Sequence, residues 1–288
     1  MTNGSTILVT GGAGFLGSHT CLDLLDHGFE VVVVDNHCNS SPRALDRVQK
    51  LAGHRLTAYE VDIRDRDALG EVFAAHPIDV VIHFAGKKAV GESLQIPLAY
   101  YDINVGGTAT LLRVMEVHNV QQIVFSSSCS IYGNAIRLPL DEDSPAGPTN
   151  PYARSKWIRE QMLADACARW PELSVIALRY FNPAGAHPSG ELGEDPTEVP
   201  KQRDALRDAG RGRPARGDLG VRRRLPNPRR LVRPRLHPCR RPRRRSPPRR
   251  RAPGRPSRPA RAQPRHGAGV SVLELIAAFC AVSGTDLP

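Results

Sequence analysis

Short apolar runs alternate with longer segments of helical spacing over residues 1–180. The run Val31–Val34 is continuous rather than alternating, as a parallel sheet covered on both faces requires. The pattern predicts strands at Ile7–Thr10, Val31–Val34, Leu56–Val61, Asp79–Phe84, Gln122–Ser126 and Ser174–Tyr180. It predicts helices between them at Phe15–His27, Arg43–Leu51, Asp65–Ala75, Ala99–His118 and Pro151–Arg169. Such strand–helix repetition predicts an α/β fold with a Rossmann-type doubly wound parallel sheet.

Residues 201–265 break this pattern. They contain twelve prolines and no aromatic residue, and they carry 24 arginines and Lys201 against three aspartates, a net charge of +22. Because the whole chain has a net charge of +11, the remainder is at −11. This asymmetry excludes a basic nucleic-acid binder as the class of the whole chain. The segment itself cannot bury enough apolar surface to offset its ordering entropy, so we expect it to be disordered.

A glycine-rich turn, Gly11–Gly17, joins the first strand to the first helix. Gly11 allows a tight turn, Gly14 lets the backbone approach a pyrophosphate, and Gly17 lets helix and strand pack closely. The helix N-terminus offers free N–H groups to phosphates. Asp35, at the end of the second strand, can bind a ribose 2′-hydroxyl and favours NAD over NADP. Asp62 ends the third strand, where it either meets the adenine or serves only as a turn residue.

Tyr152 and Lys156 lie four residues apart at the start of a predicted helix, which places them on one face. An ammonium beside a phenol favours the phenolate and lowers the pKa of the phenol. Ser128 follows the preceding strand, at the sheet edge where ligands of open parallel sheets bind. We therefore expect Ser128, Tyr152 and Lys156 to form a proton relay. His83, on an apolar strand, is expected to be a packed core histidine.

Together these features resemble the extended short-chain dehydrogenase/reductases. Longer strings, more specific than the glycine turn, are similar to the UDP-glucose 4-epimerase family. They lie at Thr10–Thr20, Phe84–Ser93, Tyr100–Thr108, Phe125–Gly133, Pro151–Lys156 and Arg179–Pro196. The resemblance covers residues 5–200 nearly continuously, and residues 267–284 again.

The resemblance implies an isomerase of galactose metabolism that interconverts UDP-glucose and UDP-galactose through a 4-keto sugar, with tightly bound NAD. Tyr152 would take the proton of the sugar 4-hydroxyl, Lys156 would bind the nicotinamide ribose, and Ser128 would hydrogen-bond the 4-oxygen. Asn182 would contact the UDP-sugar together with Ser128 and Tyr152. The NAD site would comprise Gly11, Gly14, Phe15, Leu16, Gly17, Asp35, Asn36, Asp62, Ile63, Phe84, Ala85, Gly86, Lys88, Asn104 and Tyr180.

Further expectations concern chemistry and partners. Related nucleotide-sugar dehydratases carry an Asp-Glu pair where this chain has Cys129 and Ser130, which argues against dehydration. Family members pair through two helices, here 99–118 and 151–169, which implies a homodimer. The six scattered cysteines, without a C-x-x-C, predict neither a disulfide framework nor a metal site and favour the cytosol. No run of 18 apolar residues predicts a membrane span, and no specific nucleic acid is expected.

These expectations divide the chain into an NAD-binding Rossmann domain at 1–180, the start of a substrate domain at 181–200, the disordered segment at 201–266, and a residual substrate-domain helix within 267–288. Within the last part, Ser271–Val282 has an apolar helical face. The spacing across the basic segment matches the family, so we interpret it as a reading-frame shift in a chain that also ends short of the family. Two alternatives stay open: a remnant that binds NAD without turnover, and an NAD-binding domain with an arginine-rich arm for nucleic acid.

Overall fold

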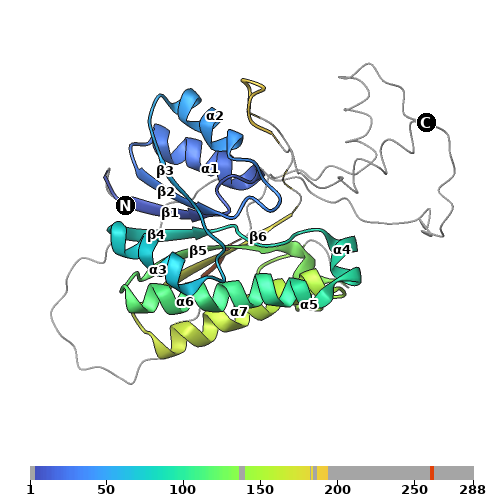
Figure 1. Ribbon diagram of the computed structural model, residues 1–288. Coiled ribbons are helices and arrows are strands. Elements are labelled where there is room, and N and C mark those ends of the chain that lie inside the picture. Colours follow the sequence, from blue (N-terminus) through green and yellow to red (C-terminus); the bar gives the residue numbers. More distant parts are fainter. Residues whose placement is uncertain (1–3, 136–139, 182, 184–186, 194–259, 263–288) are drawn as a thin grey trace, which may run out of the picture.

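The structure, a computed structural model, describes residues 4–135, 140–181, 183, 187–193 and 260–262. At its centre lies a parallel sheet in the order β3-β2-β1-β4-β5-β6-β7 (Figure 1). The strands are β1 (Thr6–Thr10), β2 (Glu30–Asp35), β3 (Thr57–Glu60), β4 (Ile78–His83), β5 (Gln122–Ser128), β6 (Ser174–Tyr180) and β7 (Ala260–Ala262). Every pair of neighbouring strands is parallel, which confirms the predicted fold class.

Helices cover both faces of this sheet (Figure 1). One face carries α1 (Phe15–Asp26) and α2 (Arg43–Ala52), and the other carries α3 (Arg66–Ala75), α6 (Gly107–Val117) and α7 (Pro151–Arg169). Successive strand residues alternate between the two resulting cores: Ile7 and Val9 belong to the core under α1 and α2, whereas Leu8 belongs to the other. All three are fully buried, which explains why the strand has no polar position.

The helix predicted at 99–118 is present, but it begins two residues earlier and a π-helical turn interrupts it. The structure has α4 (Val90–Gln95), α5 (Pro97–Tyr100), a π-helical turn η1 (Tyr101–Gly106), and then α6. A Cβ at Gly107 would lie 2.5 Å from Cδ1 of Ile63, so α6 begins where the backbone closely approaches the loop after β3. The π turn directs Asn104 into the interior, where its side chain is fully buried. Single π turns of this kind are frequent at functional sites.

Strand β7 lies inside the segment expected to be disordered, so that expectation fails for Ala260–Ala262. These residues pair with Ile176–Leu178 of β6, whose outer edge offers unpaired backbone groups. The rest of residues 201–266 and the predicted helix at 271–282 lie outside the described residues. In the part of the chain that is described, no helix has the length and apolarity needed to cross a bilayer.

Candidate functional site

The candidate site lies at the carboxyl edge of the sheet, where β1 and β4 are neighbours but lead into helices on opposite faces. Such a switch point is where open α/β sheets bind ligands. The glycine turn after β1 touches the loop after β4, since a Cβ at Gly11 would lie 2.7 Å from the backbone nitrogen of Ala85. A Cβ at Gly17 would lie 2.2 Å from the carbonyl oxygen of Gly11. Both positions therefore exclude a side chain.

The N-terminus of α1 suits a pyrophosphate. Its N-cap, Gly14, has no capping side chain, and the first helical turn contains no acidic residue. The N–H groups and the positive end of the helix dipole are thus free to meet an anion. Phe15 and Leu16 in this turn are partly buried. The residues present therefore fit the dinucleotide that the sequence pattern predicts.

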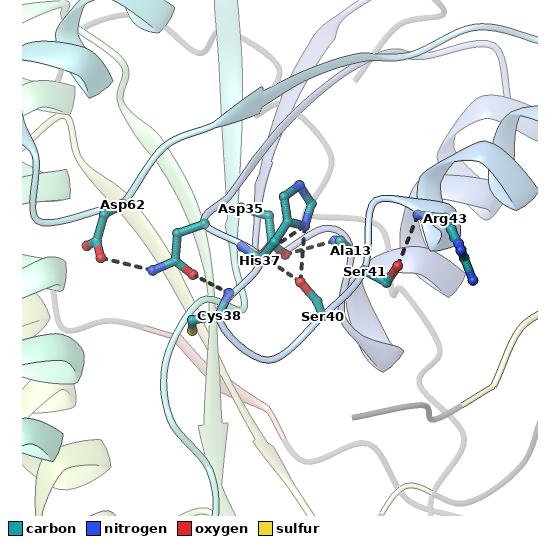
Figure 2. A network of polar contacts seen from close by, with 9 residues as sticks. Ala13, Asp35, His37, Cys38, Ser40, Ser41, Arg43 and Asp62 are labelled. Atoms are coloured by element: carbon teal, nitrogen blue, oxygen red, sulfur yellow. Dashed lines mark hydrogen bonds and ion pairs between the residues drawn. The ribbon is translucent and has the colours of Figure 1, made fainter. Parts of the chain in front are cut away.

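Asp35 organises the loop after β2 (Figure 2). Its Oδ2 accepts the backbone N–H of Ala13 at 3.0 Å, and its Oδ1 accepts the N–H of His37 at 3.0 Å and the hydroxyl of Ser40 at 2.9 Å. His37 has a positive φ of 52°, which the bond to Asp35 helps to hold. Each carboxylate oxygen accepts two hydrogen bonds, so Oδ2 retains one position for a ribose hydroxyl.

Asp62 is held by its neighbours. Its carboxylate accepts a hydrogen bond from Nδ2 of Asn36 at 2.9 Å and forms a two-pronged ion pair with Arg64, with N–O distances of 2.9 and 2.8 Å. The backbone N–H of Arg64 also donates to Asp62. Arg64 lowers the pKa of Asp62 to about 2, with Asn36 contributing. This geometry favours the turn role for Asp62, while Ile63 beside it is buried against Gly107.

Asn104 fixes the loop after β4. Its Oδ1 accepts the backbone N–H of Lys87 at 2.8 Å, and its Nδ2 donates to the carbonyl of Lys87 at 3.0 Å and to Oγ of Ser155 at 3.0 Å. A Cβ at Gly86, where φ is +145°, would lie 2.7 Å from Oδ1 of Asn104. Asn104 thus ties α7 to the loop that contains Phe84, Ala85, Gly86 and the exposed Lys88.

Ser128 and Tyr152 meet at the end of β5. Burial raises the pKa of Tyr152, and the Ser128 hydroxyl lowers it. The Oγ of Ser128 also accepts the backbone N–H of Ser130 at 3.1 Å and the hydroxyl of Ser130 at 2.9 Å. A serine hydroxyl has one proton and two acceptor positions, so these two bonds leave the Ser128 proton for Tyr152. These contacts of Ser130 were not predictable from the sequence pattern.

The predicted effect of Lys156 on the pKa of Tyr152 stays a prediction, because other groups account for the shift in this structure. Burial raises the pKa of Tyr152, and the groups that oppose this are Ser128 and the positive charge of Arg159. Lys156 lies 5.9 Å from the Tyr152 ring centre, but its Nζ donates to the carbonyl of Ser126 at 2.5 Å. Burial, followed by repulsion from Arg159, lowers the pKa of Lys156 well below its usual value.

Three other predicted positions remain. His83 is fully buried and its pKa is lowered by burial, which agrees with a packed core histidine. Tyr180, in register with Ser128 on the neighbouring strand, is 7% exposed, and burial raises its pKa. Asn182 lies outside the described residues. Sequence reasoning missed Arg159, although its spacing of three residues from Lys156 places it on the same helix face.

The fold and the site define an extended nucleotide-binding α/β protein of the short-chain dehydrogenase/reductase type. The model of the NAD dependent epimerase/dehydratase family matches residues 7–210, and the chain belongs to this family. It is 55% identical over 194 residues to UDP-glucose 4-epimerase of Bacillus subtilis, covering 67% of this chain and 57% of that protein. It is 46% identical to the Yersinia pestis UDP-glucose 4-epimerase, covering 75% of this chain and 68% of that protein.

Solved structures agree with the fold. The UDP-glucose 4-epimerase of Bifidobacterium longum, in complex with NAD⁺ and UDP, is similar with a TM-score of 0.81 and 37% identity. That similarity covers 99% of this chain and 85% of the other. Among the curated relatives, however, the B. subtilis match shows that the chain spans little more than half of the relative's length.

Proposed function

We propose that this chain is built to interconvert UDP-glucose and UDP-galactose with NAD. The observation that carries the proposal is the carboxyl edge of the sheet, where the glycine turn contacts the loop after β4 and where Ser128, at the end of β5, lowers the pKa of Tyr152 against the effect of burial. NAD, when bound, would accept and return the hydrogen of the sugar C4. The similar proteins from B. subtilis and Y. pestis, both named UDP-glucose 4-epimerase, support this choice of substrate.

The residues present would divide the work as follows. Gly11, Gly14 and the N-terminus of α1 would hold the pyrophosphate, and Asp35 would bind the ribose of the adenosine. Tyr152 would take the proton of the sugar 4-hydroxyl at its phenolic oxygen and later return it. Ser128 would stabilise the negative charge on that oxygen with its hydroxyl proton, and would turn this proton to the sugar 4-oxygen once Tyr152 has taken the sugar proton.

Two measurements test this proposal on the purified chain. Absorbance of bound nicotinamide, released by denaturation, reports whether NAD is held. NMR of UDP-galactose incubated with the chain reports whether UDP-glucose appears. We expect Tyr152→Phe to retain NAD and to abolish turnover. If NAD is bound but the unaltered chain gives no product, the NAD-binding remnant is the correct alternative; if no NAD is retained, the proposal fails.

The basic segment is proposed to be a reading-frame shift that begins near residue 200 and ends near residue 267. Its arginine, proline, alanine and glycine content is what a GC-rich gene yields in a wrong frame, and Pro226, Pro228 and His237 keep spacings of the family. Translation of the gene in the alternative frame should restore a family-like substrate domain, and the intact mass of the native protein should match the restored sequence. A native mass equal to that of the present sequence contradicts the shift.

A homodimer through the helices at 99–118 and 151–169 is also proposed, together with a cytosolic location. Exposed apolar side chains support the dimer: Val117 on α6 is 68% exposed and Ile158 on α7 is 36% exposed. The six scattered cysteines of the sequence, without a C-x-x-C, support a reducing compartment. Light scattering should give the mass of two chains, and Ile158→Glu should halve it; a monomeric unaltered chain rules the dimer out.

A further inference from the structure

A buried cation that the proposed mechanism does not use lies beside Tyr152 and Lys156. Arg159 is 0% exposed, one helical turn after Lys156 on α7. Its guanidinium carbon lies 4.5 Å from the centre of the Phe125 ring, and Nζ of Lys156 lies 5.4 Å from the same centre. Two cationic side chains therefore share one aromatic ring in a site closed to water.

Few polar groups of the described chain compensate Arg159. Its Nη2 donates to Nε2 of His83 at 2.5 Å and to the carbonyl of Ala85 at 3.3 Å. Its Nε and Nη1 are buried and find no hydrogen-bond partner among the described residues. A buried charge without a counter-ion is normally destabilising. The hydrogen bonds of Arg159 therefore do not compensate for the burial of its charge. Its position near Tyr152 and Lys156 indicates a chemical role.

The histidine under Arg159 is arranged to accept from it. Oγ1 of Thr108 lies 3.0 Å from Nε2 of His83, but it donates its proton to the carbonyl of Asn104 at 2.7 Å and so does not donate to the histidine. His83 faces Oγ1 of Thr10 through Nδ1 at 2.6 Å, and a proton on Nδ1 leaves the Nε2 lone pair for Arg159. Burial and the cations Arg159 and Lys156 lower the pKa of His83, which keeps this ring neutral. The positive charge thus remains on the guanidinium.

We propose that Arg159 is a positioning residue that supplies the fixed positive charge of the site, and that it makes both Tyr152 and Lys156 easier to deprotonate. The inference rests on the proposed function, because a change in the pKa of Tyr152 affects catalysis only where Tyr152 acts as a base. Burial lowers the pKa of Arg159 to about 9, so the guanidinium stays charged at neutral pH. The Tyr152 phenolate is the charge that stabilises it in return.

The other charged groups around the pair act in known directions. Glu160 raises the pKa of Lys156, but its carboxylate is bonded to Arg179 and Ser127. Cys129 raises the pKa of Tyr152 and so opposes Arg159. Neither group supplies a positive charge, and His83 is neutral. Arg159 is thus the group that carries the effect on both neighbours.

The test is the protonation of Lys156, which does not require turnover. The full chain has five lysines, so NMR with labelled lysine side chains can follow each amine through pH 5 to 11, and Lys156→Met assigns the signal. We expect Lys156 to titrate well below the other lysines in the unaltered chain. Arg159→Met should raise its pKa by about one pH unit or more, a tenfold weaker acid. Arg154→Met removes an exposed arginine from the same helix and should change nothing.

Each outcome decides the matter. An ordinary pKa for Lys156 in the unaltered chain, or an equal pKa in the unaltered and Arg159→Met chains, overturns the proposal. If Arg159→Met fails to fold, Arg159→Gln removes the charge but retains an N–H donor, and it carries the same comparison. A shifted Lys156 in a chain without turnover supports the role of Arg159 and refutes only the proposed function. Turnover in a chain whose Lys156 has an ordinary pKa supports the proposed function and refutes the role of Arg159.

Discussion

Two ion pairs on α7 have almost the same length but should differ widely in their contribution to stability. Glu160 and Arg179 meet at 2.8 Å with both side chains 1% exposed. Glu116 and Arg169 meet at 2.7 Å, with exposures of 47% and 76%. We predict that Glu160→Gln strongly destabilises the protein and that Glu116→Gln does so weakly.

The magnitude follows from what Arg179 would lose. Its Nε and Nη2 donate to the two carboxylate oxygens of Glu160 at 3.0 and 2.8 Å, and Nη1 donates to Tyr132 at 2.7 Å and to the carbonyl of Glu142 at 2.8 Å. Among these partners of Arg179, Glu160 supplies the negative charge. Glu160→Gln therefore leaves a buried cation uncompensated, which should lower the free energy of unfolding by about 3–5 kcal/mol. The exposed pair is screened by water, so its loss should amount to less than about 1 kcal/mol.

Equilibrium unfolding in urea, followed by circular dichroism, measures both changes, provided that the slope of the transition is unchanged. The double variant Glu160→Met/Arg179→Met separates the penalty of an orphaned charge from the net value of the pair. It should recover most of the stability lost in Glu160→Gln, because an apolar replacement of a buried pair is often neutral. If Glu160→Gln proves as mild as Glu116→Gln, burial does not control these interactions and the reasoning is refuted.

Two further predictions concern the nucleotide site. Gly17→Ala forces a Cβ to 2.2 Å from the carbonyl oxygen of Gly11. It should lower the free energy of unfolding by about 1–3 kcal/mol and weaken NAD binding measured by calorimetry. The control Gly70→Ala on α3 places its Cβ in open space and should stabilise the protein by roughly 0.5–1 kcal/mol. Equal effects of the two changes would contradict this. Because Arg64 lowers the pKa of Asp62 from 3.8 to about 2, the pair stabilises the folded state above pH 4 and loses this effect as the pH falls towards 2. The stability difference between the unaltered chain and Arg64→Met should shrink over that range, and a constant difference would refute the linkage.

The sequence predicts the sheet well because its strands are buried on both faces. A continuous run of β-branched residues such as Val31–Val34 is typical of such strands. The interruption of the helix at 99–118 was not predictable from periodicity. Directly after it, Gly107 packs against Ile63, a residue far away in the chain. Local patterns contain no record of such a contact, so the π turn and the inward direction of Asn104 appear only in the structure.

The candidate site, like the fold, could be predicted from the sequence only in part. The residue types at Ser128, Tyr152 and Lys156 predict a relay, and the structure brings Ser128 to Tyr152. The electrostatics could not be predicted, because the pKa of a phenol or an amine depends on burial and on neighbours from other elements. The spacing of Tyr152 and Lys156 suggests a direct charge effect, whereas Lys156 turns to the carbonyl of Ser126.

The buried face of α7 explains why stability and chemistry should be coupled here. Lys156, Arg159 and Glu160 are consecutive polar positions of that face, and each is at most 6% exposed. Glu160 raises the pKa of Lys156 while Arg159 lowers it, so the amine lies between opposing charges. Because Glu160 also holds Arg179 on β6, the ion pair that fixes the helix to the sheet also sets part of the potential at the amine. A change that weakens the fold at Glu160 should therefore also lower the pKa of Lys156, whereas a change at Glu116 on the exposed surface should alter neither.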